Sequence, residues 1–447
     1  MEKKWEELTP TEKRELLWKR WLSPQGIKFV SPEAKKAYKD RATRIKNAIE
    51  MKKLPDRVPV VPIIGFFPAY YSGMTPRDLM YDYDKMVKAF KKYTIDFEPD
   101  AHAGAMGAPP GRMYDILDYV LYKWPGHGVP PEQSYQAVEG EYMKPEEYDI
   151  LIQDPSFFFN NYFLPRIFKK LEPLGKLSPL TNMTEMYGGF TAASLVAYGL
   201  PDVQEALKAL MEAGTEALKW IGYAAGFSQE ATELGFPNFF GGGCKVPFDT
   251  LGDTMRGTRG MAVDIYRRPE KLLKALDVLT PIMITMGASA AKMNGNPIVF
   301  IPLHKGADGF LSDEQFKTFY WPHFKKLILG LIEEGCVPFP WAEGGYNTRL
   351  EVIRDVPKGK TIWGFDTTDM ARAKEILGGV ACITGNVPVS ILGVGTVDQV
   401  KANVKKLIHD AGKGGGYIMM NGATIDDLPP KNIKAMIDAT KEYGVYK

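Results

Sequence analysis

The chain has 447 residues, of which 45% are hydrophobic and 25% charged, ordinary values for a globular protein that buries a large core. Its 56 basic and 54 acidic residues nearly cancel, and a net charge of +2 gives no electrostatic basis for binding nucleic acid or an anionic membrane. Three scattered cysteines argue against a disulfide framework, and no segment is typical of a signal peptide or a membrane span, so we expect a cytoplasmic protein.

Residues 1–55 predict a charged helical extension. Thr9 and Ser31 each stand directly before a proline and shortly before a glutamate, a pattern typical of helix starts. The two helices are expected to run to about Trp21 and Lys53. We expect this extension to pack outside the main domain or to offer a surface for a homodimer.

From residue 56 to residue 447, strand-like runs alternate with helical stretches. Val58–Gly65 is a β-branched run that ends in glycine, and a second strand is expected at about Thr94–Phe97. Later runs of the same kind are 297–302, 336–341, 361–366, 380–385 and 416–421. Helices are expected between them at 312–334, 367–377, 396–411 and 430–443. The alternation predicts an α/β fold with a parallel sheet, closed as a (β/α)8 TIM barrel.

A long segment around 103–190 interrupts this alternation. It is rich in glycine, proline and aromatic residues and has no clear period. Segments of this length are usually functional lids or insertions.

Functional side chains are expected just after the barrel strands, because the carboxyl ends of parallel strands converge on one mouth. Glu343, His304 and Asp366 are the catalytic candidates. The candidates for substrate binding follow the same or other strands: Phe66, Phe67, Tyr70, Tyr71, His102, Trp341, Tyr346, Asn386 and Asn421.

Glu343 is the strongest of these candidates. Trp341 and Tyr346 flank it, and an aromatic surrounding disfavours the charged carboxylate, so Glu343 could act as a general acid near neutral pH. The alternatives are a solvated loop carboxylate or an ion-pair partner of Arg349.

The other two catalytic candidates also have structural alternatives. His304 could carry a proton or bind a metal, or it could be a loop histidine hydrogen-bonded to Asp308. Asp366 could bind substrate or only cap the helix that begins near Asp369.

Three stretches carry a family resemblance: Arg44–Val60, Ala307–Ile328 and the pieces between Ala373 and Gly444. They resemble the uroporphyrinogen decarboxylase superfamily, which also contains corrinoid-dependent methyltransferases. The resemblance covers roughly residues 41–447, and it implies an α/β barrel.

The sequence departs from this superfamily at two places, and each departure restricts the substrate or cofactor that can be expected. The decarboxylases carry an arginine-rich motif after the first strand, whereas the segment 65–71 has no cation, so a polycarboxylate porphyrinogen is not the expected substrate. Methyltransferases acting on coenzyme M hold zinc with a His-x-Cys pair and a later cysteine. Trp341, Glu343 and Ala423 stand at those positions, so zinc is not expected and no metal ligands are assigned.

The resemblance therefore implies methyl transfer between a small methylated donor and the cobalt of a corrinoid (cobalamin) carried by a separate corrinoid-binding protein. The donor could be an O-methyl compound, with Glu343 protonating the leaving oxygen, or a quaternary ammonium held by aromatic rings. One alternative is a decarboxylase or lyase for a non-porphyrin acid, which would need a cation such as Arg112, Arg256 or Lys305. Another is a non-catalytic corrinoid-binding protein.

Overall fold

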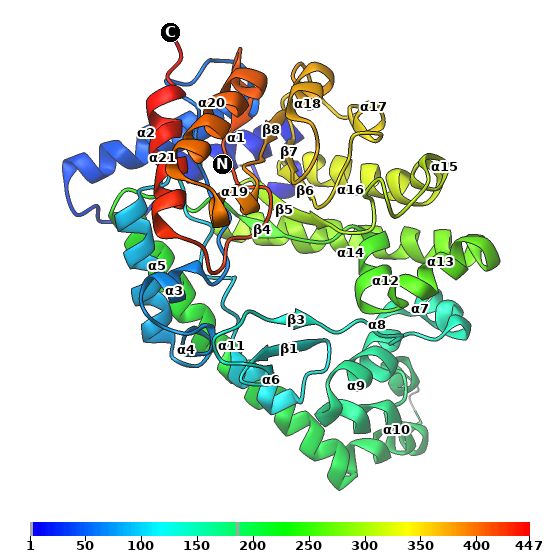
Figure 1. Cartoon of the computed structure of the whole chain (residues 1–447). Coiled ribbons are helices and arrows are strands. Elements are labelled where there is room, and N and C mark those ends of the chain that lie inside the picture. The colour runs from blue at the N-terminus through cyan, green and yellow to red at the C-terminus, as the bar shows by residue number, and fades with distance from the viewer. Residues whose placement is uncertain (1–2, 185–186) are drawn as a thin grey trace.

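The computed structural model describes residues 3–184 and 187–447, and it begins with the two expected helices, α1 (Pro10–Leu22) and α2 (Pro32–Glu50) (Figure 1). The side chains of Thr9 and Ser31 cap them, accepting hydrogen bonds from backbone N–H groups three residues later. Helix α2 ends three residues before Lys53, because Met51 turns the backbone left-handed with φ 54°.

A six-stranded parallel sheet forms the centre of the molecule, in the order β4-β5-β6-β7-β8-β9. The later predicted strands are confirmed at nearly their expected positions. The strands are β4 (Gly242–Gly243), β5 (Ile298–Leu303), β6 (Val337–Ala342), β7 (Ile362–Phe365), β8 (Cys382–Thr384) and β9 (Tyr417–Ile418).

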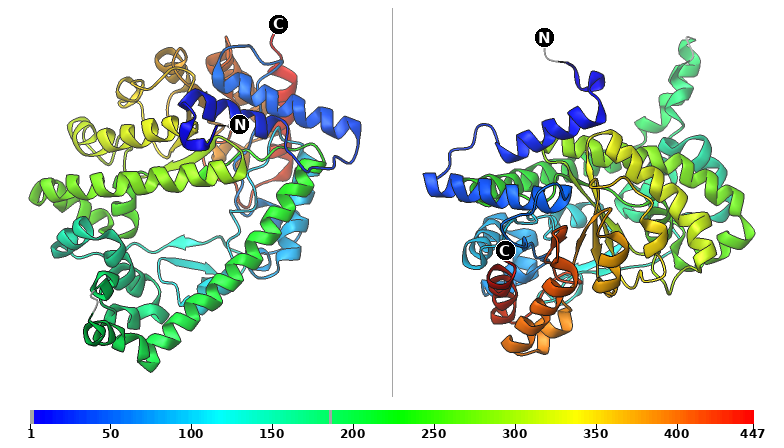
Figure 2. Two further views of the ribbon diagram at one scale, coloured as in Figure 1. Left: turned by 180° about the vertical axis from the view of Figure 1, so that it is seen from behind. Right: turned by 90° about the horizontal axis from the view of Figure 1, so that it is seen from above.

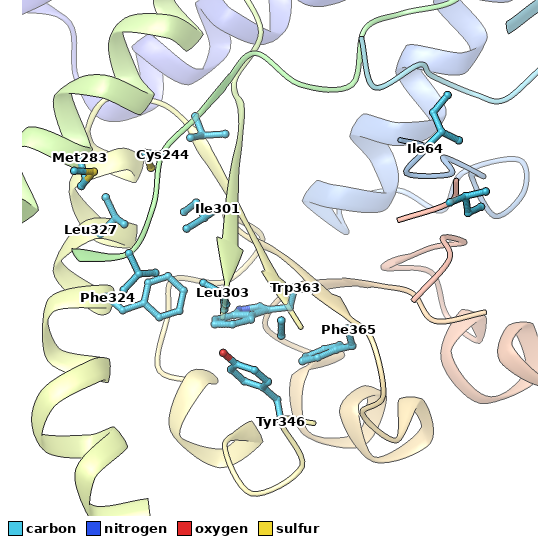
Figure 3. Packing of buried hydrophobic residues seen from close by; sticks show 14 of the residues in the cluster. Ile64, Cys244, Met283, Ile301, Leu303, Phe324, Leu327, Tyr346, Trp363 and Phe365 are labelled. Atoms are coloured by element: carbon cyan, nitrogen blue, oxygen red, sulfur yellow. The ribbon is translucent and has the colours of Figure 1, made fainter. Parts of the chain in front are cut away.

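Helices that follow or precede these strands pack on the sheet or on one another beside it (Figure 1). They are α12 (Pro247–Thr254), α13 (Gly257–Arg267), α14 (Pro269–Asn294), α15 (Asp313–Gln315), α16 (Trp321–Glu333), α17 (Leu350–Ile353), α18 (Met370–Leu377), α19 (Val389–Val394), α20 (Val397–Leu407) and α21 (Pro430–Tyr443). Figure 3 shows part of this packing, where Met283, Phe324 and Leu327 lie on the helix side of Ile301 and Leu303.

The prediction of a closed eight-stranded barrel is confirmed only in part. Among the described residues, the regular sheet has six strands, and no further regular strand closes it. Residues 57–64 continue it beside β9 through isolated parallel bridges, Val60 to Met419 and Ile64 to Ile425. Pro59 and Pro62 have no N–H to donate, which prevents this segment from forming a regular ladder. The structure is thus a mixed α/β fold with a parallel sheet.

The strand expected at Thr94–Phe97 is wrong, since these residues form the end of helix α5 (Tyr83–Phe97). Asp82 caps the helix, and the buried residues Met86, Phe90, Tyr93 and Phe97 recur every three or four positions. The first strand-like pairing after α5 comes only at His102, which forms an isolated parallel bridge with Asn238.

Residues 103–236 leave the sheet and form a separate layer to one side (Figure 1). It contains a hairpin, β1 (Tyr122–Pro125) with β3 (Gln136–Ala137), the two-residue strand β2 (Gly128–Val129), and a long returning helix, α11 (Pro201–Glu233). Its other helices are short: α6 (Gly111–Leu117), α7 (Tyr148–Gln153), α8 (Pro155–Phe158), α9 (Leu164–Ile167) and α10 (Gly188–Leu195). Two further short helices, α3 (Phe67–Tyr71) and α4 (Pro76–Tyr81), precede α5. Residues 185–186 of the expected insertion lie outside the described residues.

Within the described ranges, α14 is the one helix long and apolar enough to span a membrane by length and composition alone. It packs against β4, β5 and α16 within the fold. A Cβ atom on Gly242 would lie 2.9 Å from the carbonyl oxygen of Gly287, so the glycine permits α14 to approach the sheet closely. This is the packing of a core helix.

Candidate active site

Helix α12 fixes the loop that follows β5. The buried carboxylate of Asp249 accepts hydrogen bonds from the backbone N–H groups of His304 (3.0 Å) and Lys305 (2.9 Å) and from the hydroxyl of Tyr320 (2.8 Å). Burial raises the pKa of Asp249 and the nearby charge of Asp253 adds to this. These bonds hold the backbone of His304 in one place at the end of β5.

One helical turn later, Asp253 binds the His304 ring. Its Oδ2 atom lies 2.5 Å from His304 Nδ1 and 2.6 Å from Lys245 Nζ. Burial opposes ionisation of Asp253, but these two cationic partners prevail and lower its pKa to about 2. Burial likewise opposes the charge on His304, yet the hydrogen bond and the negative charge of Asp253 raise the pKa of the imidazole. His304 is therefore held in its protonated form above its ordinary pKa.

Glu343 lies on the other side of the same ring, with 3.7 Å between its Oε1 atom and His304 Nε2. It follows β6, two residues after Trp341, so both side chains leave the strand on the same face. The walls of the site partly desolvate the carboxylate, although 55% of the side chain is exposed, and the charge of Asp366 adds to the effect. Both raise the pKa of Glu343, while His304 opposes the shift.

The alternative pairing of Glu343 with Arg349 is wrong. The buried Arg349 guanidinium contacts Asp313 and Asp308 instead, and donates to the carbonyl oxygens of Gly306 and Leu311. The nearest cationic group to Glu343 is thus the His304 imidazole.

The alternatives for His304 and Asp366 are also resolved. Asp308 binds Thr348 rather than His304. The side chain of Asp369 itself caps α18, whereas Asp366 accepts a hydrogen bond from the backbone N–H of Gly344 (3.2 Å). Partial burial raises the pKa of Asp366. The three catalytic candidates thus come from the ends of three adjacent strands.

Trp341 is the one expected binding aromatic on the inner face of the sheet. It packs against Phe300 and Phe339 at ring distances of 5.9 and 6.1 Å, with 3% of its surface exposed. These rings form an apolar floor beneath Glu343.

Phe66, Phe67, Tyr70 and Tyr71 do not form a common pocket. Phe66 and Phe67 are fully buried, and Phe67 packs in an aromatic cluster with Tyr71. The hydroxyl of Tyr71 donates to Asp96 (2.8 Å) on α5, and that of Tyr70 to the backbone of Glu132 (2.5 Å). Their places are explained by packing and by local hydrogen bonds.

Tyr346, His102, Asn421 and Asn386 also lie in structural positions. Tyr346 is fully buried in the outer core, beside Leu303 and Phe365 (Figure 3). His102 packs its ring on Phe227 of α11 at 5.0 Å, and burial lowers its pKa to about 3.

Both asparagines bond to backbone carbonyls. The amide of Asn421 donates to the oxygens of Ile63 (2.8 Å) and Ala423 (2.7 Å) and accepts from the Ile63 N–H (2.9 Å). Asn386 donates to Thr368 (2.7 Å).

The sequence reasoning missed Asp249 and Asp253, and assigned Lys245 no part in this site. The two aspartates are four residues apart on α12, so both face the same strand ends. That spacing was the available signal, but i,i+4 aspartates also occur on solvated helix faces. Lys305, one of the three cations considered for the decarboxylase alternative, lies near this site, 3.6 Å from Asp253 and hydrogen-bonded to Thr258 (2.7 Å).

The donor set does not suit a thiolate zinc centre. In the described part of the chain, no group of three or more histidine, cysteine or acidic side chains is arranged to hold a metal ion. Cys244, Cys336 and Cys382 are all buried, and burial raises their thiol pKa values to about 12. Trp341, Glu343 and Ala423 offer no sulfur ligand.

Residues 231–443, which supply every one of the charged groups just described, match the family profile of uroporphyrinogen decarboxylase (URO-D). This part of the chain is similar to the URO-D family over just under half of the whole chain. The resemblance read from the sequence is thereby confirmed, although the profile match is shorter than 41–447. The matched span contains β4 to β9 and the helices between them.

Curated relatives agree with this assignment. The uroporphyrinogen decarboxylase of Cellvibrio japonicus is 26% identical over 196 residues, which cover 43% of this chain and 53% of the relative. That of Psychromonas ingrahamii is 31% identical over 142 residues, covering 31% of this chain and 39% of the relative. The matches thus span about half the length of these relatives or less.

Among solved structures, a methyltransferase from Methanosarcina mazei is similar over 90% of this chain and 98% of its own, with a TM-score of 0.58 and 17% identity. This likeness extends the shared fold to nearly the whole chain. The structural match includes the region before residue 231, where the family profile does not reach.

Proposed function

We propose that this protein is a methyltransferase that moves a methyl group between a small methylated donor, in the first place an O-methyl compound, and the cobalt of a corrinoid carried by a separate protein. The observation that supports it most is the line Asp253–His304–Glu343 at the ends of β5 and β6, with contacts of 2.5 and 3.7 Å. It places an acid with a raised pKa over an apolar floor at the edge of the sheet.

The corrinoid is a second substrate in this proposal, and its reduced cobalt supplies the nucleophile. The bond from the methyl carbon to the donor oxygen breaks as the carbon–cobalt bond forms, and the departing oxygen takes a proton from Glu343. His304, kept protonated by Asp253, lies next to Glu343 and can restore that proton. The product is the free hydroxyl compound.

Two further features fit this proposal. The ring of short segments that continues the sheet, 57–64 beside β9 and His102 beside Asn238, supports an irregular (β/α)8 barrel whose strand ends form one mouth. The near-neutral charge and the buried free thiols fit a cytoplasmic enzyme.

The decarboxylase alternative requires a cation that is free to bind a substrate carboxylate. Arg256 is buried and bound to Asp264 and Glu141, and Arg112 is exposed on α6. Lys305 is at the site but is already near Asp253 and bound to Thr258. The carboxylates around Glu343 would also repel an acid substrate.

The test mixes the purified protein with a reduced corrinoid protein and a panel of methyl donors and follows the cobalt spectrum. At least one O-methyl donor should methylate the cobalt. Glu343→Gln should slow this reaction by about 10²- to 10⁴-fold, because the amide cannot supply the proton.

Glu351→Gln is the matched control, since Glu351 is also a largely exposed acid but pairs with Arg354 on α17. It should react like the parent. If no donor methylates the cobalt, or if Glu343→Gln is as active as the Glu351→Gln control, the proposal is wrong. Release of carbon dioxide from a small acid would favour the decarboxylase instead.

A further inference from the structure

The hairpin of β1 and β3 is attached on both sides to helices that follow the carboxyl ends of the sheet. On one side, the hydroxyl of Tyr70 on α3 donates to the carbonyl oxygen of Glu132 (2.5 Å). On the other side, the backbone N–H groups of Tyr142 (2.7 Å) and Met143 (2.9 Å) donate to the carbonyl oxygen of Met255, directly after α12. Figure 1 shows the hairpin between α3 and α4 on one side and α12 on the other, and Figure 2 (left) shows it from behind, beside the long green helix α11. The hairpin therefore lies across the strand ends.

A chain of hydrogen bonds also joins the hairpin to the charged groups of the candidate site. The side chain of Glu139, two residues after β3, accepts a hydrogen bond from the backbone N–H of Thr258 (2.5 Å). The hydroxyl of Thr258 in turn accepts from Nζ of Lys305 (2.7 Å), which lies 3.6 Å from Asp253. The hairpin is thus held next to the charged groups at the ends of α12 and β5.

Two tyrosines of the hairpin lie close to the acids of the site. Tyr122 opens β1, Tyr135 directly precedes β3, and their rings stand edge to face with 5.1 Å between centroids. Burial raises the pKa of both hydroxyls, that of Tyr135 to about 12, and nearby charges add to the shift. The charge of Asp253 acts on Tyr122. The charges of Asp426 and Glu343 act on Tyr135. Charges more than about 10 Å apart are largely screened, so the hydroxyls lie near these acids.

The two acids near Tyr135 belong to different parts of the mouth. Glu343 follows β6, whereas Asp426 follows β9 and accepts a hydrogen bond from the backbone N–H of Phe66 (2.6 Å). In the sheet, β7 and β8 lie between β6 and β9. A hydroxyl that is close to both acids therefore lies between these strand ends, over the mouth, and not beside one of them.

Tyr135 is accessible to a ligand and stands on an aromatic support. Its side chain is 50% exposed, so the walls of an open space surround it and not a packed core. Among the described residues, neither Tyr135 nor Tyr122 has a side-chain hydrogen bond. Tyr122 packs on Tyr119 with 5.7 Å between centroids. Tyr119 in turn stacks on Tyr114 (4.8 Å) and Phe168 (4.9 Å). An accessible ring on such a support is typical of a ligand-binding surface.

We propose that Tyr122 and Tyr135 bind an uncharged methoxyarene, a benzene ring that carries an O-methyl group, between the hairpin and the apolar floor at Trp341. This inference rests on the proposed methyl transfer and names the class of its donor. Aromatic side chains bind a planar aromatic ring through edge-to-face and offset contacts that a saturated ring does not make. The hairpin thus selects the donor, while the strand ends supply the proton.

The charges around the site disfavour a donor that carries a carboxylate. Lys245 lies 2.6 Å from Asp253, and Lys305 is bound to Thr258, so both ammonium groups already have partners. The carboxylate of Glu343 stands where the donor would bind. In the described part of the site, a donor carboxylate would therefore find no unpaired ammonium group and would lie near like charges.

The leaving group also favours an aryl ether. The electron pair of the methyl–oxygen bond stays on oxygen, the methyl carbon bonds to cobalt, and the oxygen takes its proton from Glu343, which yields a phenol. A phenol has a pKa of about 10, whereas an aliphatic alcohol is close to water, at about 15.7, so a phenolate leaves more readily. A quaternary ammonium, the other class that aromatic rings bind, leaves as a neutral amine and has no use for a proton donor.

The first test measures binding by isothermal titration calorimetry, with the full chain and without a corrinoid. Methoxybenzene should bind about fivefold more tightly than methoxycyclohexane, which carries the same methyl ether on a saturated ring. Tyr135→Ala should weaken binding of methoxybenzene by about fivefold. Tyr135→Phe should retain it, because the ring makes the contact and the hydroxyl does not. Para-methoxybenzoate and tetramethylammonium should both bind more weakly than methoxybenzene.

Tyr266→Ala is the matched control, since Tyr266 is 76% exposed on α13 and its hydroxyl binds Gln315. It should bind methoxybenzene like the parent. If Tyr135→Ala binds as tightly as this control, or if methoxycyclohexane binds as well as methoxybenzene, the aromatic site is wrong. Tighter binding of either charged probe overturns the uncharged class, and a parent that binds none of the probes overturns the inference as a whole.

The second test adds a reduced corrinoid protein and measures KM and kcat for methoxybenzene. Tyr135→Ala should raise KM by about fivefold and leave kcat nearly unchanged, because Tyr135 only holds the donor. Glu343→Gln should lower kcat instead. A Tyr135→Ala variant with a lower kcat and an unchanged KM contradicts the binding role.

The two tests separate this inference from the proposed function. Methylation of cobalt by aliphatic O-methyl donors but not by methoxybenzene overturns the inference and leaves the proposed function in place. Binding of methoxybenzene as expected, with no donor methylating the cobalt, overturns the proposed function and leaves the aromatic binding site in place.

Discussion

His304 depends for its charge on a residue that is 51 positions away in the chain. Asp253 lies within 2.5 Å of its Nδ1 atom, and the backbone N–H of the same histidine is bound by Asp249. Burial alone would lower the pKa of a histidine at this position, and the Asp253 carboxylate is the largest of the causes that raise it, with smaller contributions from the charges of Glu343 and Asp249. The proton supply of the proposed reaction is therefore set by α12.

This dependence can be measured by NMR titration of the His304 ring. In the parent its pKa should lie above the ordinary value of a histidine, and in Asp253→Asn it should be lower than in the parent, because the desolvation stays while the largest compensating interaction is lost.

The raised pKa of His304 also determines the direction in which the methyl-transfer activity should change with pH. A raised pKa keeps the ring protonated as pH rises, so transfer from O-methyl donors should persist to higher pH in the parent than in Asp253→Asn. It should then decline as pH passes the folded pKa of His304. An unchanged pH profile in the variant would contradict the role given to Asp253.

At the scale of single residues, the sequence could predict the positions of Glu343, His304 and Asp366 at the ends of strands, because each one directly follows a strand-like run. It could not predict the partners of His304, because Asp249 and Asp253 lie on a helix and become neighbours of β5 only through tertiary packing. Asparagines and tyrosines after other strands were assigned to binding for the same positional reason. Position after a strand does not distinguish a side chain that faces the mouth from one that bonds to the backbone.

Asn421 is one of the side chains that bond to the backbone. At the level of secondary-structure elements, it joins the end of β9 to the segment 57–64. Three hydrogen bonds connect its amide to the backbones of Ile63 and Ala423. Prolines weaken the ladder of this segment, so a side chain takes over part of the strand pairing.

Asn421→Ala should therefore destabilise the protein by about 3 kcal/mol, because it removes three hydrogen bonds and leaves the backbone N–H of Ile63 without its partner. Asn386→Ala, which removes a single bond to Thr368, should cost about 1 kcal/mol. Chemical denaturation of both variants gives the comparison. If Asn421→Ala unfolds at the same denaturant concentration as the parent, the amide does not hold these elements together.

The elements from residue 297 onward were predictable because β-branched runs and capped amphipathic helices alternate there without interruption. The expected strand at Thr94–Phe97 failed because its apolar residues also fit a helical period, and the cap at Asp82 decided in favour of the helix. Residues 103–236 could not be predicted, since their short helices and hairpin are stabilised by packing on one another and on α11 rather than by local pattern.

For the molecule as a whole, α1 and α2 are part of one core with the sheet. Leu17, Trp18 and Trp21 of α1 have at most 5% of their surface exposed, and the indole of Trp21 donates to the carbonyl oxygen of Asn238 (2.8 Å). The extension thus covers apolar surface that would otherwise be in contact with water.

Removing residues 1–30 should therefore lower the free energy of unfolding by about 6 kcal/mol, from three buried side chains at about 2 kcal/mol each. Removing only residues 1–8 should have a small effect, because the short helix at Trp5–Glu7 buries no residue. Thermal unfolding and binding of a hydrophobic dye would show both effects. Equal stability of the longer truncation and the parent would contradict this account.

The separate layer of residues 103–236 leaves and rejoins the sheet at neighbouring points. The N–H of His102 donates to the carbonyl oxygen of Pro237, and the N–H of Phe239 donates to that of His102. Because the two ends are already adjacent, lengthening, shortening or replacing the segment changes little in the entropy of closing the loop. Evolution can thus exchange this whole layer while the cluster of charged groups on α12 and at the ends of β5 and β6 stays unchanged.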